Sequence, residues 1–288
     1  MTQRVVALIQ GRMSSSRLPG KILADIGGQP MLRRVYNRTI RARLLHDVLL
    51  ATTTDASDDP VAAYCQTNGI PFTRGSLYDV LDRYYQAARK TMAEIVVRIT
   101  ADCPLIDPGL IDDVVMVLSH DDGEGDAASL DFAANRLPPP WRRTYPIGLD
   151  VEACTFAALE RAWREAQEPH QREHVMPYLY EGVRLAPIAH GQTSHCAPFT
   201  FNIEEGLSER GFRVAVLYHP SDYGAYRWTV DTRKDLTFVR QVYAHFGGQE
   251  DFSWKDILDL VQRQPQLQAI NAKVRHKTLK DVDNRARR

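Results

Sequence analysis

The sequence predicts an α/β protein built on an open, mostly parallel sheet. Short runs of β-branched and aliphatic residues at 5–9, 48–52 and 95–99 are typical of strands that are covered on both faces. Segments with helical spacing of apolar residues separate these runs. Strand–helix alternation of this kind indicates right-handed crossovers and a parallel sheet. The 288 residues are enough for one large domain with a buried core.

The helices predicted in the first half have recognisable ends. Residues 31–44 carry apolar side chains at helical spacing. A second helix starts at Asp58-Asp59-Pro60 and ends at Asn68-Gly69, because Asp and Pro favour a helix start and Gly favours its end. Helices at 79–92 and 107–118 each begin with an Asp, followed in the latter by a Pro.

The second half is less regular. Residues 119–146, which are first acidic and then rich in proline, predict a long loop or lid. We divide the chain into a domain at 1–246 and a helical extension with a basic tail at 247–288. The tail is either a solvated terminus or a contact for an acidic ligand or a second subunit, which leaves a homodimer open. The predicted helices are 155–167, 171–180 and 235–246, and the predicted strands are 184–189, 199–203, 213–218 and 226–230.

The composition excludes several functional classes. The 36 Lys and Arg balance 36 Asp and Glu, so there is no electrostatic basis for a dedicated nucleic-acid or membrane-surface binder. No apolar run approaches the roughly 18–20 residues needed to span a bilayer, and the start of the chain lacks the pattern of a signal peptide. The four cysteines form no metal or CxxC spacing and are interpreted as reduced, buried thiols. We therefore expect a cytoplasmic globular protein.

The loop at 10–21 is the most informative segment. It holds two Gly, three Ser, two Arg and one Lys directly after the first predicted strand, where open α/β sheets bind ligands. Small residues let backbone N–H groups approach an anion, and the cations neutralise phosphate charge. The loop matches neither a Walker A sequence nor a GxGxxG sequence. It predicts phosphate binding, with a solvated basic turn as the alternative.

The order of motifs along the chain resembles one family. The sequence Arg12-Met-Ser-Ser-Ser-Arg17-Leu-Pro-Gly-Lys21 resembles the RxxSxRLPGK signature of cytidylyltransferases such as CMP-Kdo synthetase. The match is closer to the cytidylyltransferase-like proteins of spore-coat polysaccharide biosynthesis, the SpsF type. Further motifs follow in that family's order: Ala51-Thr-Thr-Thr, Arg74-Gly-Ser, Asp79-Val-Leu-Asp-Arg83-Tyr-Tyr, Arg98-Ile-Thr-Ala-Asp102-Cys-Pro-Leu-Ile-Asp107, Gly148-Leu-Asp150-Val-Glu152, Arg172-Glu173-His174-Val and Thr229-Val-Asp231-Thr-Arg-Lys-Asp235.

The resemblance implies both a fold and a reaction. The fold is that of Rossmann-like, GT-A-like nucleotide-diphosphosugar transferases, with a mixed, mostly parallel sheet. The reaction is transfer of CMP from CTP to a sugar acid, sugar phosphate or related acceptor, with release of pyrophosphate, in surface polysaccharide or glycoconjugate biosynthesis. It also implies Mg²⁺, with Asp102 and Asp231 as its ligands. Each of these follows a predicted strand, and carboxylates are ligands that Mg²⁺ accepts, but each Asp alone also suits a turn or a helix cap.

The predicted nucleotide contacts gather in three places along the chain. Lys21, Arg12, Asp102 and Asp231 are the expected catalytic residues, with Lys21 directed at the leaving pyrophosphate. Thr100 stands where CMP-Kdo synthetases carry a Gln, so neither that contact nor Kdo as the acceptor carries over. Backbone and side chains near Arg74 are the predicted cytosine contacts. The full predicted set for the nucleotide is Gly11, Arg12, Ser15, Arg17, Gly20, Lys21, Arg74, Gly75 and Thr100.

The predicted acceptor contacts are Asp150, Glu152, His174 and Arg142. A carboxylate or a neutral His can bind an acceptor hydroxyl or accept its proton. His174 could alternatively belong to a helical run in which Glu173 and its neighbours only pair with Arg172. Arg142 suits an acidic acceptor and equally suits a solvated lid.

Two other functions stay open at this point. One is a glycosyltransferase of the same fold, for which Asp150-Val-Glu152 is the nearest carboxylate-x-carboxylate sequence. The other is a non-catalytic nucleotide-binding protein. The basic loop at 10–21 suits a free triphosphate better than a diphosphate sugar. The presence of all the expected catalytic residues together favours an enzyme.

Overall fold

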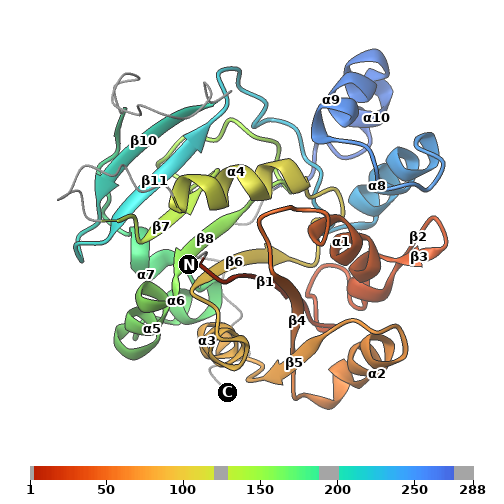
Figure 1. The fold of residues 1–288 in the computed structure, drawn as a ribbon. Helices are drawn as coiled ribbons and strands as arrows, with labels where there is room; N and C mark the ends of the chain where they lie inside the picture. The colour runs from red at the N-terminus through yellow and green to blue at the C-terminus, as the bar shows by residue number, and fades with distance from the viewer. Residues whose placement is uncertain (1–2, 120–128, 188–200, 276–288) are drawn as a thin grey trace.

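The computed structural model describes residues 3–119, 129–187 and 201–275, whose strands form a nine-stranded mixed sheet (Figure 1). The neighbours β5, β4, β1 and β6 are parallel to one another. β8 runs antiparallel to both β6 and β7, and β11 is parallel to β7. In sheet order the strands are β5 (Phe72–Gly75), β4 (Asp47–Thr53), β1 (Val5–Gln10), β6 (Ile95–Thr100), β8 (Glu152–Thr155), β7 (Phe132–Ala134), β11 (Arg213–Tyr218), β10 (Asn202–Leu207) and β9 (Ala186–Pro187).

This topology brings many strand ends to one edge of the sheet. The carboxyl ends of β5, β4, β1, β6, β7 and β11 share that edge, and the antiparallel β8 begins there. Residues that follow these strands, or precede β8, are therefore neighbours although they are far apart in sequence. Open α/β sheets bind their ligands at this edge.

Helices cover both faces of the sheet, as the alternation of buried side chains in β1 requires. Val5, Ala7 and Ile9 pack into the core on one face, and Val6 and Leu8 pack into the core on the other. Both faces are covered, so the strands are continuously apolar. One face carries α1 (Met31–Thr39), α2 (Asp59–Thr67), α4 (Pro108–Leu118), α8 (Arg233–His245), α9 (Trp254–Arg263) and α10 (Pro265–Ala269); the other carries α3 (Val80–Thr91), α5 (Phe156–Glu165), α6 (Pro169–His174) and α7 (Pro177–Tyr180).

The first half matches the prediction closely. The strands predicted at 5–9, 48–52 and 95–99 are β1, β4 and β6. Asp79 caps α3 by accepting the backbone N–H of Asp82, and Asp107 caps α4 by accepting those of Gly109 and Leu110. The predicted helix at 31–44 ends earlier, at Thr39. The helices predicted at 155–167 and 235–246 are α5 and α8, and the strand at 213–218 is β11.

Several predictions for the second half are wrong. The stretch 119–146 contains β7, which lies between β8 and β11 inside the sheet and is not part of a loop. The helix predicted at 171–180 is broken at Val175, whose φ of 72° ends α6 before α7 begins. Residues 226–230 form a single bridge, from Arg227 to Ile147, and no strand.

Two further strands are displaced from their predicted ranges. β9 covers only Ala186–Pro187 of the predicted 184–189, of which 188 and 189 lie outside the described residues. β10 begins at Asn202 and runs to Leu207, whereas 199–203 was expected and 199–200 are not described. In both cases the pairing partner decides the ends: β10 follows β11 for six residues, and β9 pairs with β10 over only two.

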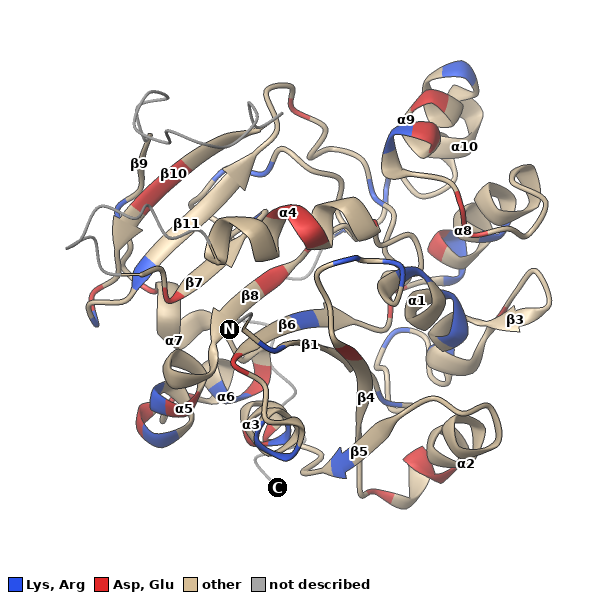
Figure 2. Cartoon of the chain, in the orientation of Figure 1, with Lys and Arg blue, Asp and Glu red and all other residues tan. Residues whose placement is uncertain are grey.

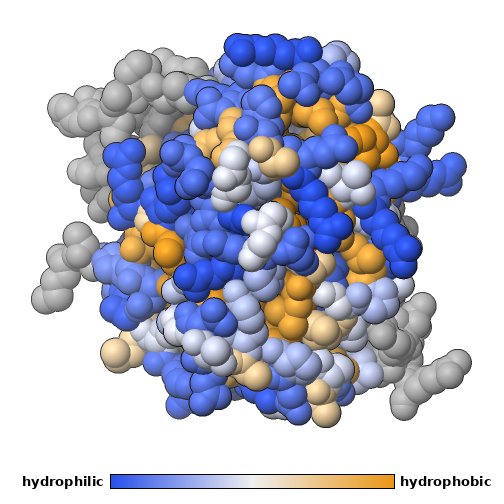
Figure 3. Space-filling model, turned by 90° about the vertical axis from the view of Figure 1, so that its right-hand side faces the viewer, coloured by the Kyte–Doolittle hydropathy of each residue, from blue (hydrophilic) through white to orange (hydrophobic). Residues whose placement is uncertain are grey.

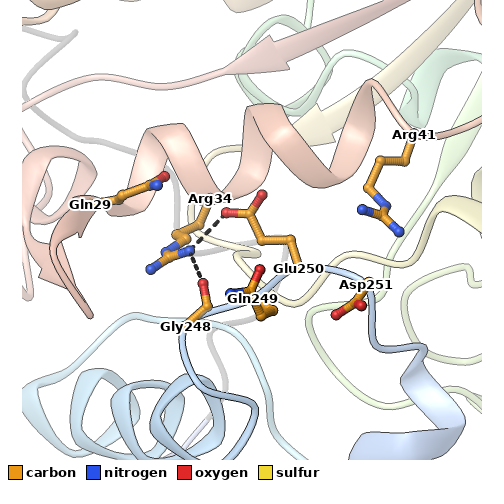
Figure 4. A pocket seen from close by; sticks show the side chains of 7 residues that line it. All are labelled: Gln29, Arg34, Arg41, Gly248, Gln249, Glu250 and Asp251. Atoms are coloured by element: carbon orange, nitrogen blue, oxygen red, sulfur yellow. Dashed lines mark hydrogen bonds and ion pairs between the residues drawn. The ribbon is translucent and has the colours of Figure 1, made fainter.

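Two buried arginines of α1 hold the segment that joins α8 to α9. Arg34 Nη1 donates to the Gly248 carbonyl at 2.7 Å and to Glu250 Oε1 at 2.9 Å across a polar pocket (Figure 4). Arg38 donates to the carbonyls of Glu250 and Phe252, both at 3.1 Å. Burial lowers the pKa of Arg38, so these carbonyl acceptors are needed to stabilise its charge. The extension is thus tied to the first helix of the fold.

Among the described residues, no helix is long and apolar enough to cross a bilayer. The face seen in Figure 3 is mostly hydrophilic, with separate hydrophobic patches. Acidic and basic residues are interspersed over the described elements (Figure 2).

Candidate active site

The loop after β1 is folded back on itself by backbone hydrogen bonds. The Met13 carbonyl accepts the N–H groups of Ser15 at 2.8 Å and Gly20 at 2.9 Å, and the Met13 N–H donates to Asp58 Oδ1 at 2.6 Å. Ser15 Oγ accepts the N–H of Leu18 at 3.4 Å, so this side chain shapes the loop. Gly20 has a φ of 74°, which a residue without a side chain adopts at little cost. This turn starts a short 3-10 helix at Lys21–Leu23.

The turn directs the Lys21 side chain between two carboxylates. Lys21 Nζ lies 2.8 Å from Asp102 Oδ2 and 3.0 Å from Asp231 Oδ1, and it donates to the Val230 carbonyl at 2.8 Å. The structure therefore brings together three of the four predicted catalytic residues, from positions up to 210 residues apart. We call Lys21, Asp102 and Asp231, together with the Asp231 partners Arg17 and Arg227, the Lys21 cluster.

Asp231 reaches the cluster without the predicted strand. The irregular segment before it is held by two backbone bonds, from Val230 N–H to the Asp102 carbonyl at 2.8 Å and from Trp228 N–H to the Ile147 carbonyl at 2.7 Å. Gly148 allows this approach, because a Cβ there would lie 2.5 Å from the Thr229 backbone nitrogen. The Gly148 motif thus has a packing role beside the site.

Charges in the Lys21 cluster shift the protonation of its members. Asp231 Oδ2 lies 2.7 Å from Arg17 Nη2 and 2.7 Å from Arg227 Nη2. Burial would raise the pKa of Asp231, but the charges of Lys21 and Arg17 hold it well below its usual value. Burial would lower the pKa of Lys21, but Asp102 and Asp231 outweigh it and raise that pKa. The Lys21 ammonium and the Asp231 carboxylate are therefore charged at neutral pH.

The donor set of the cluster fits Mg²⁺ in a complex with phosphate. Asp102 and Asp231 already face one common positive centre, the Lys21 ammonium. Mg²⁺ is usually bound by one or two carboxylates together with substrate phosphates and waters. Within residues 3–119, 129–187 and 201–275, no group of three or more His, Cys, Asp and Glu side chains is placed to hold a metal ion. A metal here would need oxygen atoms from a substrate.

Arg12 links the loop to the segment that follows β5. Arg12 Nη1 donates to the Leu77 carbonyl at 3.3 Å. Arg83 Nη1 donates to the adjacent Ser76 carbonyl at 2.6 Å, while its Nε and Nη2 find no hydrogen-bond partner among the described residues. Burial lowers the pKa of Arg83 to about 10. Sequence reasoning did not select Arg83, although it lies inside one of the recognised motifs.

Arg74 and Gly75 lie within β5, at the outer edge of the sheet, and not after it. Arg74 Nε donates to the Thr53 carbonyl at 2.7 Å, and its Nη2 lies 2.6 Å from Asp59 Oδ1. These contacts join β5 to the start of α2 and do not reach the Lys21 cluster. Gly75 packs against the Arg83 side chain, where a Cβ would lie 3.0 Å from Arg83 Cγ.

Two other predicted nucleotide contacts lie at the ligand edge. Gly11 follows β1 and is buried between Ile22 and Ala101. Thr100 ends β6, and its Oγ1 lies 3.2 Å from Cys103 Sγ. Both positions therefore flank the Lys21 cluster at the ends of β1 and β6.

The predicted acceptor carboxylates are separated into two ion pairs. Asp150 lies 2.5 Å from Arg143 Nη1, with Arg136 Nε 3.9 Å away. Glu152 Oε2 lies 2.5 Å from Arg98 Nη1, at directly paired positions of β8 and β6, where Figure 2 shows an acidic segment beside a basic one. Sequence reasoning placed neither Arg136 nor Arg98 in the site. Arg136 follows β7 by two residues, and this strand was hidden in the predicted loop. We call Asp150, Arg136 and Arg143 the acceptor side.

The remaining predicted acceptor residues, Arg142 and His174, have contacts of a different kind. Arg142 pairs with Glu204 at 2.6 Å and stacks over the Tyr218 ring at 4.2 Å, with 56% of its side chain exposed. His174 ends α6, where its carbonyl accepts the N–H of Met176 at 2.9 Å. Arg172 donates through Nε to Asp79 at 3.1 Å, so its ion-pair partner belongs to α3 and is not Glu173.

Residues 6–209 match the sequence model of a family described as cytidylyltransferase. The chain belongs to the cytidylyltransferase family. Family membership and fold confirm the predicted nucleotidyltransferase class and mixed, mostly parallel sheet. The chain is 27% identical to the Bacillus subtilis spore coat polysaccharide biosynthesis protein SpsF, over 91% of this chain and 95% of that protein.

Solved structures give the same result. A cytidylyltransferase of Leptospira borgpetersenii superposes with a TM-score of 0.76 at 27% identity, over 95% of this chain and all of that one. A CMP:2-keto-3-deoxy-manno-octonic acid synthetase complexed with CTP superposes with a TM-score of 0.55 at 18% identity, over 84% of this chain and 99% of that one, which shows a shared fold. The family match ends at residue 209, so Asp231 lies outside it.

Proposed function

We propose that this cytidylyltransferase transfers CMP from CTP to an acidic acceptor and releases pyrophosphate, with Mg²⁺ bound by Asp102 and Asp231. The observation that carries the proposal is the Lys21 cluster, in which two carboxylates face one cation directly beside a phosphate-type loop. Nucleotidyl transfer needs such a place, since charge develops on phosphoryl oxygens while pyrophosphate departs from the α-phosphorus.

Each residue of the loop has a separate task in this proposal. Bound Mg²⁺ would offset phosphate charge and orient the triphosphate. Arg17 and Lys21 donate to triphosphate oxygens, and Lys21 neutralises the charge that develops on the leaving pyrophosphate. In the free protein the three N–H groups of Lys21 are directed at Asp102, Asp231 and the Val230 carbonyl, which keeps the ammonium beside the site. Donation to the triphosphate requires that the two carboxylates turn from Lys21 to the metal. Arg12 fixes the segment after β5 through the Leu77 carbonyl and adds charge to the triphosphate site.

The cytosine contact is proposed for residues 74–77. Arg12 and Arg83 each donate to a carbonyl of this segment, which gives it a fixed backbone. A fixed backbone with free hydrogen-bonding groups can distinguish the amino group of cytosine from the carbonyl of uracil. Arg74 contributes by joining this strand to α2.

The acceptor is proposed to be a sugar acid, a sugar phosphate or a phosphonate. Arg136 and Arg143 flank Asp150 at the same edge as the Lys21 cluster, and guanidinium forks bind carboxylate and phosphate groups well. Asp150 and His174 are the proposed partners of the acceptor hydroxyl, and one of them accepts its proton. The likeness to SpsF supports a place in surface polysaccharide synthesis. Homodimer formation stays a prediction.

Pyrophosphate release is the direct test. The protein is incubated with Mg²⁺, each of the four nucleoside triphosphates, and pools of sugar acids, sugar phosphates and phosphonates, and the products are examined by mass spectrometry. The expected result is acceptor-dependent release with CTP and a cytidylylated product. If none of the four triphosphates gave pyrophosphate, while a sugar nucleotide added separately was consumed, the proposal would be overturned in favour of a glycosyltransferase.

A further inference from the structure

A residue of the C-terminal extension donates hydrogen bonds to two residues that contact Asp231. Asn271 lies just beyond α10 and is buried. Its Nδ2 donates to the Arg227 carbonyl at 2.9 Å and to Asp235 Oδ1 at 2.9 Å. These acceptors precede it by 44 and 36 residues. The extension therefore reaches, at Asn271, the segment that carries Asp231.

Asp235 is the next member of this chain of contacts. It has no exposed surface, and its Oδ1 also accepts Arg227 Nε at 2.9 Å. Its Oδ2 accepts the backbone N–H of Asp231 at 3.1 Å and that of Thr232 at 2.8 Å. Donors at both oxygens fix the plane of this carboxylate, which in turn fixes the backbone of Asp231.

Arg227 carries the constraint to the Asp231 side chain. While its Nε bonds to Asp235, its Nη2 donates to Asp231 Oδ2 at 2.7 Å. The guanidinium is planar, so its orientation at Asp235 determines where Nη2 presents its hydrogen to Asp231. The whole path is buried, and in such surroundings each hydrogen bond is stronger and each missing partner costs more.

We propose that Asn271 is a positioning residue for Asp231, acting through Asp235 and Arg227. The role of Asp231 in binding Mg²⁺ is taken from the proposed function. Without the Asn271 amide, the Arg227 carbonyl has lost one donor and Asp235 Oδ1 keeps only Arg227 Nε. A buried carboxylate in that state turns toward other donors, and Arg227 turns with it.

The amide is not required to hold the extension in place. Leu267 of α10 is buried in the core on this face of the sheet, and the partly buried Ile270 packs against the same core. Apolar contacts of this kind anchor the segment without polar bonds. The two bonds of the Asn271 amide are directed at the Arg227–Asp235 pair, where they determine orientation.

The test compares Asn271→Ala and the equal-sized Asn271→Asp with a core variant, Ile257→Val in α9. The first readout needs no substrate: the rate at which acetic anhydride modifies Lys21 in the free protein, measured by mass spectrometry. A displaced Asp231 releases Lys21, so we expect about tenfold faster modification in Asn271→Ala. We expect a larger increase in Asn271→Asp, where a second carboxylate faces Asp235. Ile257→Val should leave the rate of Lys21 modification unchanged, even if it lowers the melting temperature as much as the Asn271 variants do.

The second readout is the affinity for Mn²⁺ in the presence of CTP. Electron paramagnetic resonance measures the free Mn²⁺ in each titration. Apparent affinity should fall about tenfold in Asn271→Ala and stay near the wild-type value in Ile257→Val, because Asn271 orients Arg227, and loss of such an outer partner of a metal ligand has an effect of at least this size. Unchanged Lys21 modification in both Asn271 variants would overturn the proposal. If the wild type itself bound no Mn²⁺ with CTP, the proposed function would fail, while the modification rates would still decide the role of Asn271.

Discussion

The Lys21 cluster and the acceptor side use their carboxylates in different ways. In the cluster, Asp102 and Asp231 converge on one ammonium. On the acceptor side, Asp150 faces two arginines, and the nearby Glu152 has an arginine of its own in the sheet. Convergence makes a site for one cation, whereas two arginines around one carboxylate leave an excess of positive charge that suits an anion. In the proposed function, the two regions therefore serve opposite parts of one reaction, the metal-bound triphosphate and an acidic acceptor.

The largest effect on turnover is expected from removing one of the two carboxylates that converge on Lys21. Asp102→Asn removes a negative charge that lies 2.8 Å from the Lys21 ammonium. The ammonium loses an ion-pair partner, and a bound Mg²⁺ would lose a carboxylate ligand. We expect turnover to fall about 10²–10³-fold in pyrophosphate release with CTP. Asp251→Asn, at an exposed position between α8 and α9, is the control and should retain full turnover. Equal turnover in Asp102→Asn and the control would mean that Asp102 only caps the turn after β6.

The second prediction asks whether the ammonium acts on the triphosphate. Lys21→Met should reduce kcat about 10²-fold at saturating CTP, since it removes one donor to the developing charge. Lys21→Arg should not restore activity, because a planar guanidinium does not fit a position shaped by three short contacts to one nitrogen. Lys90→Met, on the exposed side of α3, serves as the control. Wild-type kcat in Lys21→Met would leave the cluster without its proposed chemical role.

On the acceptor side we expect a smaller and more selective effect. Arg143→Ala should raise the KM for the acceptor about tenfold and leave the KM for CTP unchanged, since an arginine paired to a substrate anion contributes on this scale. The neighbouring Arg142, which is largely exposed and pairs with Glu204, gives the matched variant Arg142→Ala. A larger loss in Arg142→Ala than in Arg143→Ala would move the acceptor site toward β10.

A carboxylate outside both regions gives the smallest predicted effect. Burial, together with the charges of Asp107 and Asp112, raises the pKa of Asp113 to about 6 from its ordinary 3.8. The neutral form is therefore favoured in the folded state, and the stability it provides is complete below the ordinary pKa and lost as the pH rises through about 6. Asp113→Asn stays neutral, so it should exceed the wild type by about 1 kcal/mol above pH 6, allowing for solvent screening at this partly exposed group.

Thermal denaturation between pH 5 and pH 8 measures this difference, which corresponds to roughly 2 °C in Tm. The gain should grow with pH over that range. Asp112→Asn is the contrasting variant, because Asp112 accepts the backbone N–H groups of Arg43 and Leu44 and its loss should destabilise the protein. A gain in Tm of Asp113→Asn that did not depend on pH would contradict the proposed cause.

The contrast between the two regions also explains what the sequence could predict. Asp102 follows an obvious strand, and Lys21 ends a loop of recognisable composition, so strand ends alone bring them to one edge. The sequence predicts Asp231 beside them for an incomplete reason. Residues 226–230 are rich in aromatic and β-branched side chains, as a strand would be, but they are held by backbone bonds to other loops. A buried segment that does not pair with a strand has the same sequence pattern as one that does.

The missed features depend on tertiary pairing. The Arg98–Glu152 pair exists because β8 lies next to β6 in one register, and no local pattern records that register. β7 has only three residues, Phe132–Ala134, and its place between β8 and β11 is determined by its neighbours. The break at Val175 was unexpected because a β-branched residue with positive φ contradicts local preference.

The bonds from α1 to the segment after α8 have a consequence for the length of the chain. A fragment ending at residue 246 would keep Arg34 and Arg38 but lose the Gly248, Glu250 and Phe252 oxygens that accept their hydrogens. Two guanidinium groups would then be left in the interior with too few acceptors, which is among the most destabilising changes a fold can undergo. Helix α1 and the segment after α8 are therefore expected to change together in evolution. A natural relative that stops before this segment is expected to carry uncharged residues at the positions of Arg34 and Arg38.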